Sequence, residues 1–241
     1  MSPSPRADKR PWALALARRY ARFKAGRALD GVRVDGLEQA RRLGRETPLL
    51  IAANHVSFWD AFLMVLLDEA LETDGYVLMD RASLERLPFM GPLGALPLDR
   101  SQATTALRDL DEAASLLDRP GRALWIYPQG DQRPHHLRPL CFKRGVQRLA
   151  ERASAPVLPV ALAYHFADAP EPAARVRIGA PLEPSAPDLT LRLEAQVADM
   201  LDGLDAAFLT RAPPERLLTP ARSRSPERGL GARLLGGRTQ S

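Results

Sequence analysis

Residues 48–53 form a short apolar run, Pro-Leu-Leu-Ile-Ala-Ala, that leads directly into a polar cluster at residues 54–60. The run is too short and too uniformly apolar for a surface helix, so it predicts a strand that is buried on both faces. Strands of this kind are typical of parallel sheets covered by helices. This feature therefore favours an α/β fold with a polar cluster at the carboxyl end of a central strand.

Other segments repeat this alternation along the chain. Residues 32–37, in the segment between residues 31 and 46, predict a short strand and turn. Further strands are predicted at residues 76–79, 123–127, 157–162 and 175–178, and helices at residues 61–71, 104–117, 142–153 and 189–209. Residues 88–97 read as an apolar loop rich in proline and glycine. Ligand sites in such folds lie beyond the carboxyl ends of the strands. We therefore expect a single α/β domain at residues 31–210, a mixed and mostly parallel sheet flanked by helices.

The two ends of the chain are basic and the body between them is acidic. Residues 1–33 hold nine basic and two acidic side chains, and residues 211–241 hold seven and two, in a chain of net charge +5. On a helix, Trp12, Leu16, Tyr20 and Phe23 form a stripe opposite the arginines. This pattern predicts an amphipathic membrane-surface helix at residues 1–30, although the stripe could equally pack on its own domain. The tail at residues 211–241 is rich in Arg, Pro, Gly and Ser, so we expect it to be disordered.

The composition of the chain indicates where in the cell the protein is expected and which classes of partner it is expected to have. The single cysteine, Cys141, cannot form an internal disulfide, and no secretory signal is evident, so we expect a cytoplasmic chain. Because charges interrupt every apolar stretch, membrane contact should be peripheral, at the inner face of the cell membrane. Basic ends would suit nucleic acid on electrostatics alone. A recognised binding module is missing, so we expect no nucleic-acid partner.

His55 follows the buried strand, and Asp60 comes five residues later. Positions five apart diverge on a helix, so the two side chains can meet only if His55 lies in the turn before the helix. A carboxylate on one imidazole nitrogen would fix the tautomer and prepare the other nitrogen to take a proton. Alone, this spacing favours a structural histidine. The other motifs shift the balance towards a general base.

Two later clusters add polar groups to the same edge of the sheet. The apolar loop ends in Asp99 and Arg100, where a planar guanidinium could bind an anionic group or form a surface ion pair. Residues 128–133 place polar side chains at a strand exit shaped by proline and glycine. Conversely, His135 and His136 diverge as neighbours, so we expect no metal there; His165 reads as structural and Cys141 as inert.

Five motifs follow one another along the chain: Asn-His-x-Ser-x-x-Asp (54–60), an apolar segment ending in Leu-Asp-Arg (98–100), Tyr-Pro-Gln-Gly (127–130), Phe-Lys-Arg-Gly (142–145) and Leu-Pro-Val-Ala (158–161). In this order they resemble the glycerolipid (lysophospholipid) acyltransferase family. The resemblance covers residues 31–162. It implies an acyl-CoA or acyl-carrier-protein donor, a lipid acceptor, catalysis without an acyl-enzyme, and neither metal nor cofactor.

The resemblance also implies roles for residues. His55 would be the base and Asp60 its orienting partner. The predicted substrate-binding residues are Asn54, Ser57, Asp99, Arg100, Gln129, Gly130, Arg133, Lys143 and Pro159. The residues themselves give Ser57 a second reading, as a cap for the helix that begins near Asp60.

The third motif departs from the family pattern Phe-Pro-Glu-Gly-Thr-Arg. This chain has Gln129 in place of glutamate, inserts Asp131, and displaces the arginine to Arg133. Arg100, Lys143 and Arg144 could still hold a phosphate, but an uncharged glycolipid-type acceptor is as plausible as a lysophospholipid. A catalytically silent lipid-binding or scaffold protein of the same fold is the alternative function. The sequence names neither the acceptor, the acyl length, the donor nor the oligomeric state.

Overall fold

A computed structural model describes residues 9–167 and 169–219 of the chain. Along it the elements are α1 (Pro11–Ala28), β1 (Val32–Asp35), α2 (Leu37–Glu46), β2 (Leu49–Ala53), α3 (Asp60–Leu71), β3 (Asp74–Asp80), α4 (Arg81–Arg86), the 3₁₀ helix η1 (Pro88–Leu93), β4 (Ala95–Leu98), α5 (Ala103–Ala114), β5 (Arg122–Ile126), α6 (Gly145–Ala153), β6 (Val157–His165), β7 (Ala173–Ile178), α7 (Leu189–Leu209) and β8 (Arg216–Thr219). Helices and strands alternate through most of this order, as the sequence predicts.

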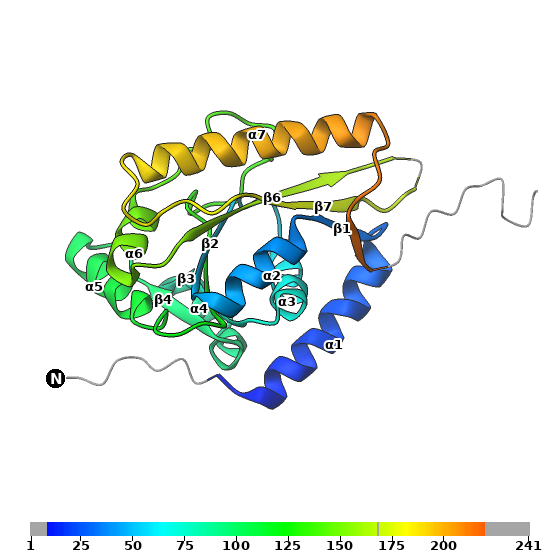
Figure 1. Cartoon of the computed structure of the whole chain (residues 1–241). Coiled ribbons are helices and arrows are strands. Elements are labelled where there is room, and N and C mark those ends of the chain that lie inside the picture. The colour runs from blue at the N-terminus through cyan, green and yellow to red at the C-terminus, as the bar shows by residue number, and fades with distance from the viewer. Residues whose placement is uncertain (1–8, 168, 220–241) are drawn as a thin grey trace, which may run out of the picture.

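The strands form one mixed sheet with the order β4-β3-β5-β2-β6-β7-β1-β8 (Figure 1). From β4 to β6 every neighbouring pair is parallel. β7 runs antiparallel to β6, and β8 runs antiparallel to β1. The expected mixed, mostly parallel α/β sheet is therefore confirmed, and β2 lies inside its parallel part, between β5 and β6.

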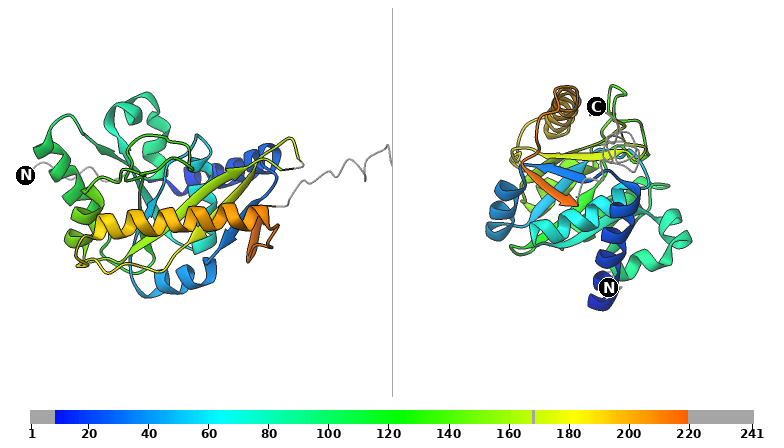
Figure 2. Two further views of the ribbon diagram at one scale, coloured as in Figure 1. Left: turned by 90° about the horizontal axis from the view of Figure 1, so that it is seen from above. Right: turned by 90° about the vertical axis from the view of Figure 1, so that its right-hand side faces the viewer.

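Helices cover both faces of the sheet (Figures 1 and 2). α1, α2 and α3 pack on one face, where they meet Leu49, Ile51 and Ala53 of β2. α5, α6 and α7 pack on the other face, where they meet Leu50 and Ala52. Every residue of β2 is buried because both faces are covered. This arrangement explains the unbroken apolar run in the sequence.

Several segments differ from the prediction, including η1, which lies in the loop predicted at residues 88–97. α2 occupies part of a segment read as a strand and turn; its buried positions are limited to Leu37, Ala40 and Gly44, so its apolar stripe is thin. β4 lies in the predicted loop, and its place at the sheet edge tolerates Pro97. β8 lies in the tail that was predicted to be disordered, so that prediction was wrong for Arg216–Thr219, which pair with the edge of β1. Residues 220–241 lie outside the described part.

α1 packs on the domain through small residues. Ala13, Ala21 and Ala25 are its buried positions. The stripe on another side of the helix stays in solvent, with exposed fractions of 65% for Trp12, 62% for Leu16, 49% for Tyr20 and 56% for Phe23. The stripe is therefore mostly exposed, although its Tyr20 ring also contacts the domain, 6.0 Å from the ring of Phe62 in α3. Among the described helices, none combines the length and the apolar character needed to cross a membrane.

Candidate active site

The polar cluster begins with a clamp between two strands. Asn54 follows β2 and is buried, and its side-chain amide donates to the Leu162 carbonyl at 2.9 Å while its carbonyl accepts the Leu162 N–H at 2.7 Å. Both polar groups of the side chain are thus bonded to β6. Asn54, predicted to bind substrate, thus fixes where the chain leaves the sheet.

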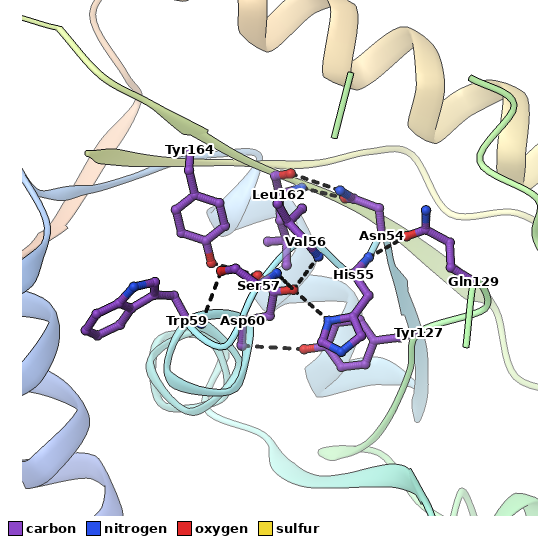
Figure 3. Close-up of polar contacts among 10 residues, drawn as sticks. All are labelled: Asn54, His55, Val56, Ser57, Trp59, Asp60, Tyr127, Gln129, Leu162 and Tyr164. Carbon is purple, nitrogen blue, oxygen red and sulfur yellow. Dashed lines mark hydrogen bonds and ion pairs between the residues drawn. The ribbon is translucent and has the colours of Figure 1, made fainter. Parts of the chain in front are cut away.

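His55 and Asp60 meet across the turn that joins β2 to α3. The Nδ1 atom of His55 lies 2.7 Å from Oδ2 of Asp60 (Figure 3). The turn before α3 brings together two positions that a continuous helix would separate. With the carboxylate at Nδ1, the proton resides on that nitrogen, and Nε2 is left as a lone pair that can accept another proton.

Asp60 is fully buried and is held by several donors. Its Oδ2 accepts the N–H groups of Val56 at 2.6 Å and Ser57 at 3.0 Å in addition to the His55 ring. Its Oδ1 accepts the Tyr164 hydroxyl at 2.7 Å (Figure 3). A buried charge is tolerable when its lone pairs are satisfied in this way. The carboxylate is therefore oriented before any substrate binds.

The third motif frames His55 from the neighbouring strand. The side-chain oxygen of Gln129 accepts the His55 N–H at 2.6 Å, and the Arg133 N–H donates to the His55 carbonyl at 2.8 Å. The Tyr127 ring lies 4.5 Å from the imidazole, centre to centre. An amide oxygen can accept this N–H at the position of a carboxylate oxygen, so the glutamine in place of the family's glutamate is compatible with an intact frame.

Tyr164 is a site residue that the sequence analysis missed. It lies near the end of β6, beyond the strand predicted at residues 157–162. Burial is the main reason that the pKa of Tyr164 is raised, and the charge of Asp60 raises it further. Burial likewise raises the pKa of Tyr127. Both phenols therefore stay protonated and act as donors. Extending the predicted strand by two residues on the alternate-residue pattern would have placed Tyr164 beside Leu162 on one face.

His55 opens onto a cavity of about 930 Å³. Its walls come from the ends of β3, β4 and β5 and from α3, α4, η1 and α5. They are largely apolar, with Ala61, Met64, Val77, Leu78, Met79, Leu87, Met90, Leu98, Ala106, Leu110 and Ile126 among the lining residues. A concave apolar space beside a prepared base is the arrangement expected of a binding site for an apolar substrate.

Charged groups gather at one side of this cavity. Arg100 and Lys143 converge on Gly130, where a Cβ atom would lie 2.6 Å from Nη1 of Arg100 and 2.7 Å from Nζ of Lys143. Gly130 also has a φ of +79°, which favours glycine. Arg100 is partly neutralised, because its Nε lies 3.1 Å from Asp80 and its Nη2 lies 3.9 Å from Asp131.

The remaining predicted substrate-binding residues do not line this cavity. Ser57 accepts the Trp59 N–H at 3.1 Å in the turn ahead of α3. The N-cap residue of α3 is Trp59, and no side chain caps this helix, so Ser57 stabilises the turn and its reading as a cap is wrong. Asp99 accepts hydrogen bonds from the hydroxyl and the N–H of Ser101, which lower the pKa of its carboxyl. The Arg133 guanidinium is directed to backbone carbonyls of its own loop.

Pro159, which was predicted to bind substrate, lies inside the sheet. It lies buried within β6, opposite Ala52 of β2. Its carbonyl accepts the Gly179 N–H at 2.9 Å, just before the pairing of β6 with β7 begins at Val160. The missing N–H of proline therefore falls where no ladder bond is required. Its role is in the sheet.

The family model described as Acyltransferase matches residues 31–163, which is more than half of the chain. The chain belongs to the Acyltransferase family. It is 31% identical over 118 residues to a 1-acyl-sn-glycerol-3-phosphate acyltransferase of Saccharomyces cerevisiae, covering 47% of this chain and 38% of that protein. It is 33% identical over 141 residues to the protein of the same description from Pseudomonas aeruginosa, covering 56% and 51%. This acyltransferase family member thus spans about half or less of the length of these curated relatives.

A solved structure supports the fold of this family member. The crystal structure of the 1-acyl-sn-glycerophosphate acyltransferase PlsC from Thermotoga maritima superposes with a TM-score of 0.58 and covers 80% of each chain at 20% identity. At that identity the likeness concerns the fold alone. The predicted family and the predicted fold class are therefore both confirmed.

Proposed function

We propose that this protein is an O-acyltransferase that moves an acyl chain from a thioester donor to a hydroxyl of a lipid acceptor. The observation that carries the proposal is the 2.7 Å contact of His55 Nδ1 with buried Asp60 at the wall of an apolar cavity. The names of the relatives support the reaction class, and the cavity supports an apolar substrate. The reaction needs no resident cofactor, because the donor is a co-substrate.

In the proposed mechanism the acceptor hydroxyl gives its proton to Nε2 of His55 while its oxygen attacks the thioester carbonyl carbon. The resulting tetrahedral centre collapses, the carbon–sulfur bond breaks, and the departing thiolate takes the proton back from the imidazolium. Asp60 stabilises the imidazolium between these steps, as its contact with Nδ1 allows. An acyl-enzyme is not formed, and a metal is not required.

We further propose that the acceptor is a lysophospholipid whose phosphate lies between Arg100 and Lys143. Both cations line the cavity and meet at Gly130, and a phosphate is the anion that such a pair would recognise. The second candidate is an uncharged, hydroxylated lipid. It is favoured by Asp80 and Asp131, which already compensate part of the charge of Arg100.

Two acceptors of equal acyl length separate these candidates. Purified protein would be assayed for thiol release from acyl-CoA, and in parallel from acyl carrier protein, with a lysophosphatidate or a monoacylglycerol. We expect Lys143→Gln to raise the KM for lysophosphatidate about tenfold and to leave the monoacylglycerol reaction unchanged. Arg144→Gln is the control, because that exposed neighbour lies outside the cavity. Faster reaction with monoacylglycerol would select the uncharged acceptor, and no thiol release with any acceptor would favour a silent lipid-binding protein.

We propose that α1 holds the protein at the inner face of the cell membrane. Its exposed stripe continues towards the site, since the Tyr20 ring lies 6.0 Å from Phe62, and Phe62 lies 5.2 Å from Phe58 in the turn after His55. Phe58 and Phe89 are themselves largely exposed. An aromatic surface flanked by arginines suits an interface with anionic lipid. A lipid acceptor could then reach the cavity from the membrane.

Sedimentation with phosphatidylglycerol vesicles tests this orientation. The double variant Trp12→Ser and Phe23→Ser should bind at least about tenfold more weakly than the wild type, because both side chains are more than half exposed. Leu191→Ser removes a comparably exposed apolar side chain from α7, on the opposite face of the sheet, and should bind normally. Equal loss in both variants, or none in either, would contradict the proposal.

A further inference from the structure

Three side chains distant in sequence meet beyond the carboxyl end of β6. His165 is the last residue of β6, Asp205 lies in the last two turns of α7, and His135 lies in the loop that follows the third motif. One ligand atom from each lies within 4.8 Å of the other two. The sequence places His135 beside His136 and gives no hint of the other two partners. Only the fold assembles the cluster.

We propose that His135, His165 and Asp205 bind a divalent transition metal ion, with zinc as the best fit. Two imidazoles and one carboxylate are a donor set that zinc accepts readily. The proposal is independent of the proposed acyl transfer, since none of the three side chains lines the cavity beside His55.

The spacing of the ligand atoms suits a tetrahedral ion. With bonds of about 2.0–2.1 Å, a tetrahedral zinc separates its ligand atoms by about 3.3 Å. Oδ1 of Asp205 lies 2.7 Å from Nε2 of His165 and 3.5 Å from Nε2 of His135. These two separations bracket the required value, and the third, between the two imidazoles, is within 4.8 Å, so side-chain movements would bring the three ligand atoms onto one ion.

The residues around the cluster orient the His165 ring and leave one side of the cluster open to solvent. The His165 ring is stacked on Phe208 with centroids 4.5 Å apart and planes 16° apart, and this contact sets the ring orientation. The Asp205 side chain is 39% exposed, so water can approach as a fourth ligand. The ion would be reached from solvent.

A metal here would join the third-motif loop to the rest of the domain. His135 lies two residues after Arg133, whose N–H is bonded to the His55 carbonyl at 2.8 Å. An ion shared with β6 and α7 would therefore fix a loop that frames the catalytic base. The ion would have a structural role, so zinc should both bind to the protein and raise the stability of its fold.

Zinc titration of the full chain tests the proposal. After treatment with a chelator and dialysis, the wild type should take up one equivalent of Zn²⁺ by isothermal calorimetry, and its melting temperature should rise with zinc. His135→Gln and Asp205→Asn should each bind at least about tenfold more weakly and lose the thermal response, because each removes a ligand. His135 and Asp205 are not in the core, so both variants are expected to fold, and melting without zinc would check this.

Two controls separate this site from other zinc-binding groups. His136→Gln alters the neighbouring exposed imidazole, and Cys141→Ser removes the exposed thiol. Both should retain the wild-type stoichiometry and affinity. Cobalt as a second probe should give the intense visible bands of a tetrahedral ion. The proposal is overturned if the wild type binds no stoichiometric zinc, or if His135→Gln and Asp205→Asn bind zinc as the wild type does.

Discussion

Replacing Asp60 by asparagine removes one negative charge beside His55 and preserves the shape of the side chain. The contact of 2.7 Å between Nδ1 and Oδ2 places the imidazolium and carboxylate charges about 4 Å apart when His55 holds the substrate proton. At an effective dielectric constant of about 20, their attraction is about 4 kcal/mol. Because about 1.4 kcal/mol corresponds to a factor of ten in rate, kcat should fall about 10³-fold.

The assay for this variant is thiol release from acyl-CoA at saturating acceptor, with circular dichroism and melting as checks of the fold. The asparagine oxygen can still accept the N–H groups of Val56 and Ser57, so the turn should persist. Asp202→Asn makes the same change at an exposed position of α7 and should leave kcat unchanged. A folded Asp60→Asn protein that works within about tenfold of the wild type would refute the charge-stabilisation argument.

Three further substitutions test the surroundings of the dyad and the core. Tyr164→Phe removes the hydroxyl that donates a hydrogen bond to Oδ1 of Asp60. Because an unpaired buried acceptor costs about 1–3 kcal/mol, kcat should fall about tenfold. An unchanged kcat and an unchanged pH–rate profile would argue against a positioning role for Tyr164. Burial raises the pKa of Asp68 to about 6 from 3.8; at about 1.4 kcal/mol per pH unit its ionisation costs about 3 kcal/mol. The contribution of this raised pKa to the free energy of unfolding is therefore present below pH 4 and is lost as the pH rises through 6. In urea unfolding, the free energy of unfolding of the wild type should fall relative to that of Asp68→Asn between pH 4 and 7. Parallel curves of unfolding free energy against pH for the two proteins would contradict this. Gly130→Ala places a side chain on a backbone of positive φ, where it meets Arg100 and Lys143. The KM for lysophosphatidate should therefore rise at least about tenfold. An unchanged KM would show that these two cations do not bind the acceptor.

The parallel core of the fold could be predicted because burial on both faces leaves a simple trace in the sequence. The apolar run at residues 48–53 became β2, fully buried between two layers of helices. The edges were harder to predict. β8 forms because Arg216–Thr219 pair with the edge of β1, and the local sequence of these residues does not indicate that pairing. Strand pairing between distant segments is a tertiary effect that propensity does not capture.

In the candidate site too, the local contact could be predicted from the sequence and the long-range contacts could not. His55 and Asp60 could be paired from the sequence because a strand exit and a helix start lie between them, and their contact is what the structure shows. The partners that hold the pair come from elsewhere in the chain. Tyr164 and Gln129 reach the dyad only through the side-by-side arrangement of β6, β2 and β5. The same limit hid the meeting of His165 with Asp205.

The central claim is that His55 removes the proton from the acceptor hydroxyl. Its most direct test is the pre-steady-state rate of thiol release from acyl-CoA by His55→Gln, compared with the wild type at saturating lysophosphatidate across the neutral pH range. Glutamine can keep a hydrogen bond to Asp60 but cannot accept the proton, so we expect a loss of about 10³-fold or more with an unchanged melting temperature. A folded His55→Gln protein that transfers acyl groups at the wild-type rate would contradict the account.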